Sequence, residues 1–179
     1  KGWSASPCGA LVTLGARAKA RLETTQSTSF ACDLRKWTDI MAAYMSGGHA
    51  YHATMPTDAL RSFRDVIIET EERGFDNLRA LQQELGDKVR ALLLSKGIKS
   101  VAAAGFEAPG VVVSYTDDPE IHNGKKFLDL GIQIAAGVPL QCDEPEDFQT
   151  FRIGLFGLDK LNNVDRAVGR LEEALNQNL

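Results

Sequence analysis

The sequence is poor in the residues and runs that mark several large protein classes. Its cysteines, Cys8, Cys32 and Cys142, are odd in number and widely scattered, which argues against a disulfide framework and against a zinc site. No apolar run approaches the length of a membrane span, and the start does not resemble a signal peptide. Acidic residues number 24 and basic residues 20, and this net charge of -4 argues against a nucleic-acid or anionic-membrane surface. A cytoplasmic protein without a metal site is the simplest interpretation.

What is present is typical of a folded protein. A length of 179 residues suffices for one sizeable core, or for one domain and part of another. The apolar content of 44% and charged content of 25% are those of a soluble globular chain. Because the chain starts at Lys1 without an initiator Met and runs at once into an apolar segment, we expect the back part of a longer polypeptide.

Local patterns predict a first half made mainly of helices. Apolar spacing and stop signals indicate four of them, over residues 16–23, 33–45, 57–73 and 75–96. Gly74 and Gly97 occupy the positions where C-terminal caps belong. A short β-branched and leucine-rich run bounded by glycines, residues 10–14, predicts a buried strand before the first helix.

After Gly97 the sequence pattern changes and predicts strands alternating with helices. Strands are predicted over residues 98–103, 110–115, 131–136 and 150–157, and helices over 117–130 and from 162 to the end. The second half therefore predicts a small α+β domain, and the first half predicts the tail of an α/β domain. We place the boundary at residues 73 and 74.

One arginine stands in an apolar strand with glycines, Thr150-Phe-Arg-Ile-Gly-Leu-Phe-Gly157. The bulky neighbours of Arg152 suit a pleated, half-buried surface, so its guanidinium must meet an anion or reach water. A planar fork of donors fits a carboxylate with two parallel hydrogen bonds, which is how small acids are commonly bound. The residue type alone also allows an ion pair with a nearby Asp or Glu.

Three separated motifs make the sequence similar to the class V aminotransferases of the fold type I pyridoxal-phosphate enzymes, of the alanine–glyoxylate and serine–pyruvate type. In that family a cofactor lysine precedes a Pro- and Gly-containing loop and a strand, as Lys1 precedes residues 2–14. The family's Tyr-His-His-Thr-x-Pro loop is matched by Tyr51-His-Ala-Thr-Met-Pro56. Its Arg-Ile-Gly-Leu-x-Gly strand and final helix are matched by residues 152–157 and by the helix from Val164. The spacing agrees too, and the likeness covers this whole chain but only the C-terminal half of such an enzyme.

This resemblance implies a fold and a set of roles. Residues 1–73 would be the end of the large cofactor-binding α/β domain, and residues 74–179 the small α+β domain with a mainly antiparallel sheet. Lys1 would bind pyridoxal 5'-phosphate as a Schiff base and then carry a proton. Tyr51 and Thr54 would reach the cofactor phosphate of the neighbouring subunit, which implies a homodimer. Arg152 would anchor the carboxylate of a small amino acid, alanine or serine, or of a 2-oxo acid, glyoxylate or pyruvate.

Departures from the family pattern leave the substrate open. The loop after the lysine carries one extra residue, Ser6-Pro-Cys-Gly9, Ala53 replaces the second histidine of the motif, and Ala136-Gly137 replaces a glycine pair. A pyridoxal-phosphate lyase, a phosphonate-type transaminase and a non-enzymatic acid-binding module are the alternatives. The sequence offers no aromatic plate for the pyridine ring, no acid for its nitrogen and no Gly-rich phosphate cradle, so we expect the chain alone to be inactive.

Overall fold

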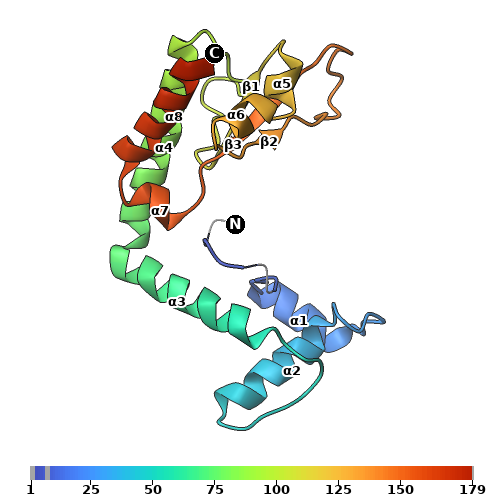
Figure 1. The fold of residues 1–179 in the computed structure, drawn as a ribbon. Coiled ribbons are helices and arrows are strands. Elements are labelled where there is room, and N and C mark those ends of the chain that lie inside the picture. The colour runs from blue at the N-terminus through green and yellow to red at the C-terminus, as the bar shows by residue number, and fades with distance from the viewer. Residues whose placement is uncertain (1–2, 7–8, 179) are drawn as a thin grey trace. The chain divides into compact units, whose positions relative to one another are not determined.

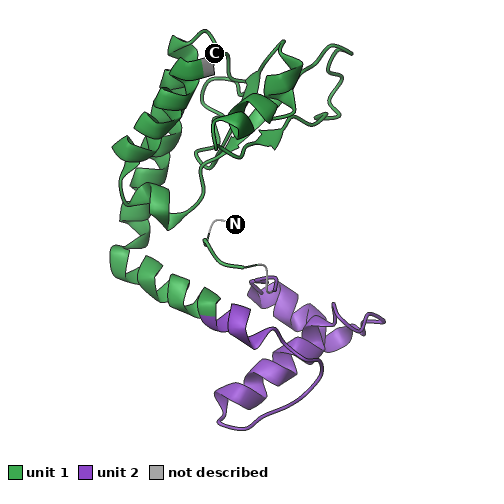
Figure 2. Cartoon of the chain, in the orientation of Figure 1, with its two compact units in different colours: residues 1–6, 62–179 green, residues 7–61 purple. Residues whose placement is uncertain are grey.

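The computed structural model describes residues 3–6 and 9–178, and its elements run from α1 to α8 with three strands, β1 to β3 (Figure 1). The chain divides into two compact units, unit 1 with residues 1–6 and 62–179 and unit 2 with residues 7–61 (Figure 2). This division follows spatial contacts and falls inside helix α3, so the predicted domain boundary at residues 73 and 74 stays a prediction.

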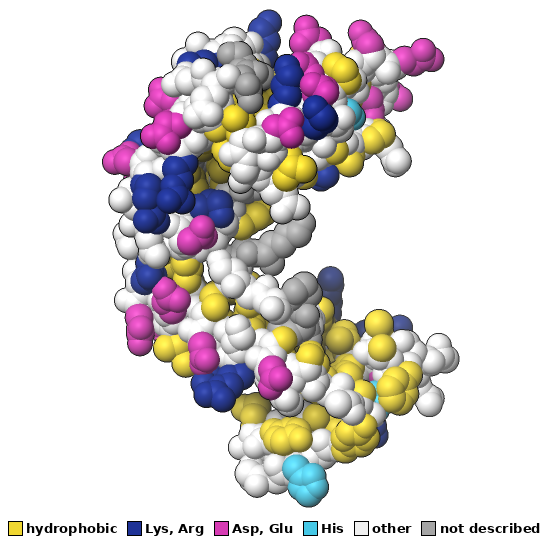
Figure 3. Space-filling model, viewed as in Figure 1, with side chains coloured by type: hydrophobic (Ala, Val, Ile, Leu, Met, Phe, Trp, Pro, Cys, Tyr) yellow, Lys and Arg dark blue, Asp and Glu magenta, His cyan; other side chains and the backbone are white. Residues whose placement is uncertain are grey.

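Unit 2 contains α1 (Ala16–Thr24), α2 (Leu34–Met45) and the start of α3 (Thr57–Arg73), close to the predicted bounds. Asp33 caps α2 because its carboxylate accepts a hydrogen bond from the backbone N–H of Lys36. No described side chain of unit 2 is buried, and large apolar side chains lie exposed across it (Figure 3). They include Leu11, Phe30, Met41, Tyr44 and Met45. A folded unit rarely exposes so much apolar surface without a partner.

The strand predicted over residues 10–14 is wrong. These residues form no regular element, and Leu11 and Val12 are exposed. A strand needs a neighbour for its backbone N–H and C=O groups, and among residues 9–61 the structure contains no strand that could pair with it.

Two long helices form the frame of unit 1. Helix α4 (Phe75–Ser95) packs against α8 (Val164–Asn178), and the short α7 (Leu158–Leu161) contacts both (Figure 1). The leucine and valine face expected from the sequence is the one that α4 buries, with Leu85 and Val89 each 1% exposed. Gly74 separates α3 from α4 with φ +83°, a conformation that suits glycine.

A three-stranded antiparallel sheet completes unit 1, in the order β1 (Val111–Tyr115), β3 (Thr150–Gly154), β2 (Ala135–Ala136). The strand that carries Arg152 is therefore the central one. Its alternate residues Phe151 and Ile153 are buried in the core, where Phe151 meets the ring of Phe127 at a centroid distance of 5.6 Å. The expected small domain with an antiparallel sheet is confirmed.

Other predicted elements are shorter than expected. Residues 98–103 contribute a single bridge, Ser100 to Ser114, and of residues 131–136 only the last two pair. The arginine strand ends at Gly154, and the backbone N–H of Leu155 still donates to the carbonyl of Gly110, its partner in the same register. The helix predicted over residues 117–130 is broken at Gly124, with φ +83°, into α5 (Pro119–His122) and α6 (Lys125–Asp129).

Candidate functional site

Arg152 lies on the central strand with its guanidinium held at one end. Its Nε donates a hydrogen bond of 2.8 Å to the carbonyl oxygen of Ala136 on the neighbouring strand β2. Within residues 3–6 and 9–178, no carboxylate forms an ion pair with Arg152. The edge formed by the two terminal nitrogens is thus available for the paired hydrogen bonds that a carboxylate accepts.

The residues that hold this arginine were not identified from the sequence. Ala136 acts through its backbone carbonyl, which any residue type would offer. The following Gly137 lies against Thr150, so close that an added Cβ would be 2.1 Å from the Thr150 carbonyl oxygen and 2.4 Å from its Oγ1. The alanine–glycine pair before the Val-Pro turn is the one signal in the sequence that points to this close approach.

A pocket of about 250 Å³ lies beside this part of the sheet. Thr150, Gly137 and His122 contribute to its wall, and the Nδ1 of His122 is 2.7 Å from the Thr150 carbonyl oxygen. Glu144 also lines it, and the backbone N–H groups of Cys142 and Gln141 donate to its carboxylate at 2.8 and 2.9 Å. These bonds stabilise the charged form and lower the pKa of Glu144 to about 2.

Unit 2 brings the two predicted phosphate-binding side chains together. The hydroxyls of Tyr51 and Thr54 are 3.1 Å apart on an exposed loop, and the Tyr51 side chain is 75% exposed. His52, between them, is tied to the unit instead: its Nε2 is 2.9 Å from the Phe30 carbonyl oxygen, and its ring packs against Phe30 and Trp37. The loop is therefore fixed by His52 and presents two hydroxyls to the exterior.

This hydroxyl pair fits one end of a phosphate group. The two hydroxyls are hydrogen-bonded to each other at 3.1 Å, so one of them uses its only proton within the pair. The other can donate to a phosphate oxygen, and both can reach oxygens of the same phosphate once the bond between them is exchanged. Arg152 belongs to unit 1 and the pair to unit 2, so the structure brings Tyr51 and Thr54 together but does not join them to Arg152.

Lys1, the predicted cofactor lysine, lies outside the described residues. Residues 3–6 are described and belong to unit 1. Trp3 meets the rings of Phe63 and Phe75 edge to face, with centroids 5.9 and 6.3 Å away. Ser4 has φ +53°, and its hydroxyl accepts a hydrogen bond of 3.1 Å from the backbone N–H of Leu158, which helps to hold this unfavourable backbone conformation.

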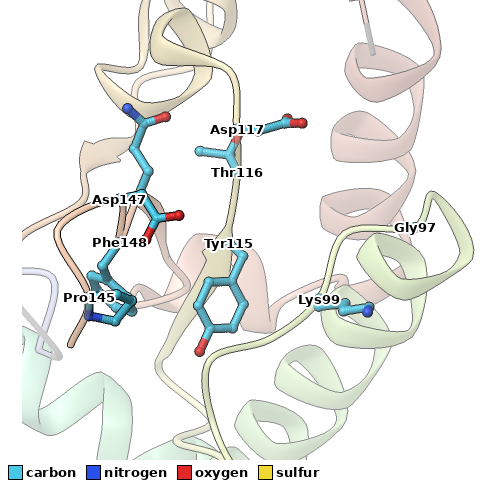
Figure 4. Close-up of a pocket in the computed structure, with 9 residues that line it drawn as sticks. Gly97, Lys99, Tyr115, Thr116, Asp117, Pro145, Asp147 and Phe148 are labelled. Atoms are coloured by element: carbon cyan, nitrogen blue, oxygen red, sulfur yellow. The ribbon is translucent and has the colours of Figure 1, made fainter. Parts of the chain in front are cut away.

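A second and larger pocket, of about 470 Å³, shares Pro145 and Phe148 with the first one (Figure 4). Tyr115 and Phe148 meet edge to face in it, with centroids 5.8 Å apart, and Lys99 points away from them. Of the predicted site residues that the structure describes, Tyr51, Thr54 and Arg152, none lines it. Among the residues that the structure describes, no group of His, Cys, Asp and Glu is arranged to hold a metal ion, and no helix has the length and apolarity needed to cross a membrane.

Comparison with known proteins yields one curated relative and several solved structures. The chain is 30% identical over 110 residues to Alanine–glyoxylate aminotransferase 1 of Saccharomyces cerevisiae, which is 59% of this chain and 28% of the relative. No protein-family model matches it.

The solved structures cover nearly all of the chain. Alanine–glyoxylate aminotransferase from Nostoc sp. superposes with a TM-score of 0.68 at 17% identity, over 91% of this chain and 42% of that one. The subgroup IV aspartate aminotransferase of Thermus thermophilus gives 0.68 at 21%, over 93% and 44%. Ureidoglycine–glyoxylate aminotransferase of Bacillus subtilis gives 0.68 at 20%, over 93% and 42%. The chain thus spans less than half the length of each of these proteins.

The fold is that of the fold type I aminotransferases, which are pyridoxal-phosphate enzymes. The resemblance to the C-terminal part of a class V enzyme, of the alanine–glyoxylate type, is confirmed by the yeast relative, and the superposed structures share the fold.

Proposed function

We propose that this chain is part of a pyridoxal-phosphate-dependent aminotransferase. The reaction would move an amino group between a small amino acid, alanine or serine, and a 2-oxo acid, glyoxylate or pyruvate. The observation that carries the proposal is Arg152, held at Nε by the Ala136 carbonyl and free of described carboxylates at its other edge, on the central strand of an aminotransferase fold. The names of the yeast, Nostoc and Bacillus proteins support glyoxylate as the acceptor.

Arg152 binds the feature that all these substrates share. An amino acid and a 2-oxo acid both carry a carboxylate next to the reacting carbon, so one arginine can hold the donor and then the acceptor in the same place. Two parallel charge-assisted hydrogen bonds fix the position and the plane of the carboxylate. The reacting carbon is then held in one orientation, and substrate held in the reactive orientation reacts faster.

Tyr51 and Thr54 bind the cofactor phosphate in this proposal. Their convergent, exposed hydroxyls support it, and their exposure also suits a phosphate bound in a neighbouring subunit. The exposed apolar side chains of unit 2, among them Met41, Tyr44 and Met45, support a homodimer, because such surfaces commonly form interfaces.

Lys1 carries the proton in this proposal. Bound pyridoxal phosphate supplies an aldehyde and a ring that withdraws electrons from the substrate α-carbon. With the cofactor bound, the Nζ of Lys1 would take up the proton lost by that carbon and would later release it within the same site. A lysine has an ordinary pKa of about 10.4, so the site must favour the neutral amine by desolvation and by nearby positive charge.

A spectral titration of the intact protein with pyridoxal phosphate tests the proposal. Adding L-alanine should abolish the cofactor's visible absorption band, with one molecule of pyruvate formed for each bound cofactor that loses this absorption. Adding glyoxylate should then restore the band. A lyase would release its product without this cycle, and an acid-binding module would show only the absorption of the free cofactor, with no shift on adding the protein. Either result refutes the proposal. The 179-residue chain alone should show no transamination, because it offers neither a plate for the cofactor ring nor a partner for the ring nitrogen.

A further inference from the structure

We propose that Gly137 is a positioning residue for the substrate-binding arginine, an inference that rests on the proposed role of Arg152. The absence of a side chain at Gly137 allows the backbone to approach Thr150 closely. That approach fixes the Ala136 carbonyl where it accepts the hydrogen bond from Arg152 Nε. The glycine thereby sets the direction of a guanidinium that it does not touch.

The covalent link between these groups is short and stiff. The carbonyl of Ala136 and the nitrogen of Gly137 belong to one planar peptide unit, so movement of Gly137 moves the oxygen that holds Arg152. An alanine Cβ at residue 137 would lie 2.1 Å from the Thr150 carbonyl oxygen and 2.6 Å from the Thr150 carbonyl carbon. Both are backbone atoms of a residue that is 1% exposed, so the segment that contains Gly137, directly after β2, must yield.

The consequence for Arg152 follows from its freedom of rotation. With Nε bonded to Ala136, the two terminal nitrogens lie in a defined plane, ready for a carboxylate. Without that bond the long side chain is free to adopt several rotamers, and the substrate must select one of them. Binding weakens for the donor and the acceptor alike, whereas the chemical step after binding is unchanged.

Gly154 provides a matched control on the same strand as Arg152. An added Cβ there meets no atom within 4 Å, and its φ is not in the left-handed region. Gly137→Ala should raise KM for both substrates about tenfold with kcat nearly constant, the effect of losing one charge-assisted hydrogen bond. Gly154→Ala should leave both constants unchanged.

A second background separates positioning from general damage to the fold. Lysine has no Nε–H in the arginine position, so in an Arg152→Lys protein the Ala136 carbonyl no longer holds the side chain through that bond. Gly137→Ala should then add little to the KM of Arg152→Lys. An equal rise of KM in both backgrounds would show nonspecific distortion and overturn the inference.

A measurement without turnover completes the test and does not require the Gly137→Ala variant to fold. In the intact protein labelled with 15N-arginine, the Arg152 Nε–H signal is identified by its loss in Arg152→Lys. This hydrogen should exchange with water at least about tenfold more slowly than that of the exposed Arg170, because a bonded N–H is protected. Equal exchange rates would refute the bond to Ala136 and with it the inference.

The two proposals fail in different ways. An unaltered KM in Arg152→Ala would overturn the carboxylate role of Arg152 itself. If KM rises in Arg152→Ala but Gly137→Ala and Gly154→Ala have the same KM as each other, only the positioning role of Gly137 is overturned.

Discussion

Replacing Arg152 by lysine should separate the geometry of this site from its charge. Lysine keeps the positive charge but is a single point donor, whereas the guanidinium offers two parallel N–H groups to a carboxylate. The substitution also removes the Nε that the Ala136 carbonyl holds at 2.8 Å. Substrates should therefore bind to the lysine variant with one charge-assisted hydrogen bond fewer and with a less fixed partner.

The expected size of this loss follows from those contacts. A hydrogen bond to a charged group contributes about 1.5 to 3 kcal/mol, which corresponds to a rise in KM of roughly 10- to 150-fold. Arg152→Ala should raise KM still further, because it leaves the substrate carboxylate without a counter-charge. Thermal stability should change little in both variants, because Arg152 is only half-buried and forms no ion pair with the described carboxylates.

Steady-state kinetics of the intact enzyme with alanine and glyoxylate would measure these effects. Arg170→Lys serves as the control, since Arg170 lies exposed on helix α8 and has no hydrogen-bond partner among the described side chains. KM for both substrates should rise from the wild type to Arg152→Lys, and again from Arg152→Lys to Arg152→Ala. The proposed geometry would be refuted if Arg152→Lys had the KM values of the wild type, or if KM changed for only one of the two substrates.

Three further outcomes are expected. Tyr51→Phe should weaken retention of pyridoxal phosphate by about tenfold because one hydroxyl of the hydrogen-bonded pair is lost, whereas Tyr115→Phe, on strand β1 of unit 1, should not; dialysis followed by absorbance would measure this. Glu144 has its pKa lowered from 4.5 to about 2, so its contribution to stability is complete above pH 4.5 and is lost as the pH falls toward 2. In Glu144→Gln, the free energy of unfolding measured in urea should therefore depend less steeply on pH over that range. An unchanged dependence on pH would contradict the prediction. Leu85→Ala should lower the free energy of unfolding by about 2 to 5 kcal/mol, because Leu85 is 1% exposed in the core, and Leu94→Ala, at a residue 65% exposed, should cost much less in the same denaturant titration.

The helices were predictable from the sequence because their signals are local. Asp33, Gly74 and Gly97 mark helix ends by their own chemistry, and the leucines of α4 recur at helical spacing. The arginine strand was predictable for a similar reason, since bulky residues alternate on either side of Arg152 and pack into the core.

The errors concern segments whose structure depends on a partner. Residues 10–14 and 98–103 have suitable composition for strands, but backbone pairing requires a neighbour at the right distance, which composition does not reveal. The break at Gly124 was missed because glycine is tolerated inside helices, and here the chain uses its positive φ instead.

Part of the candidate site was beyond the sequence for a related reason. Arg152, Tyr51 and Thr54 carry distinctive side chains at motif spacing, so sequence could nominate them. The group that orients Arg152 is the backbone carbonyl of Ala136. Every residue type has such a carbonyl, so the sequence does not reveal which one binds the arginine. This contact becomes apparent only in the structure, where Gly137 lies directly against Thr150.

The anchoring of Trp3 and Ser4 in unit 1 affects how the chain can fold. Residues 3–6 contact Phe63, Phe75 and Leu158, so unit 1 is complete only after the whole of unit 2 and nearly all of the remaining chain have been synthesised. Closing such a long loop carries an entropic cost, and contacts distant in sequence form late. The segment that follows Lys1 should therefore dock last, and a protease cut within unit 2 should leave it attached to unit 1 without a covalent link.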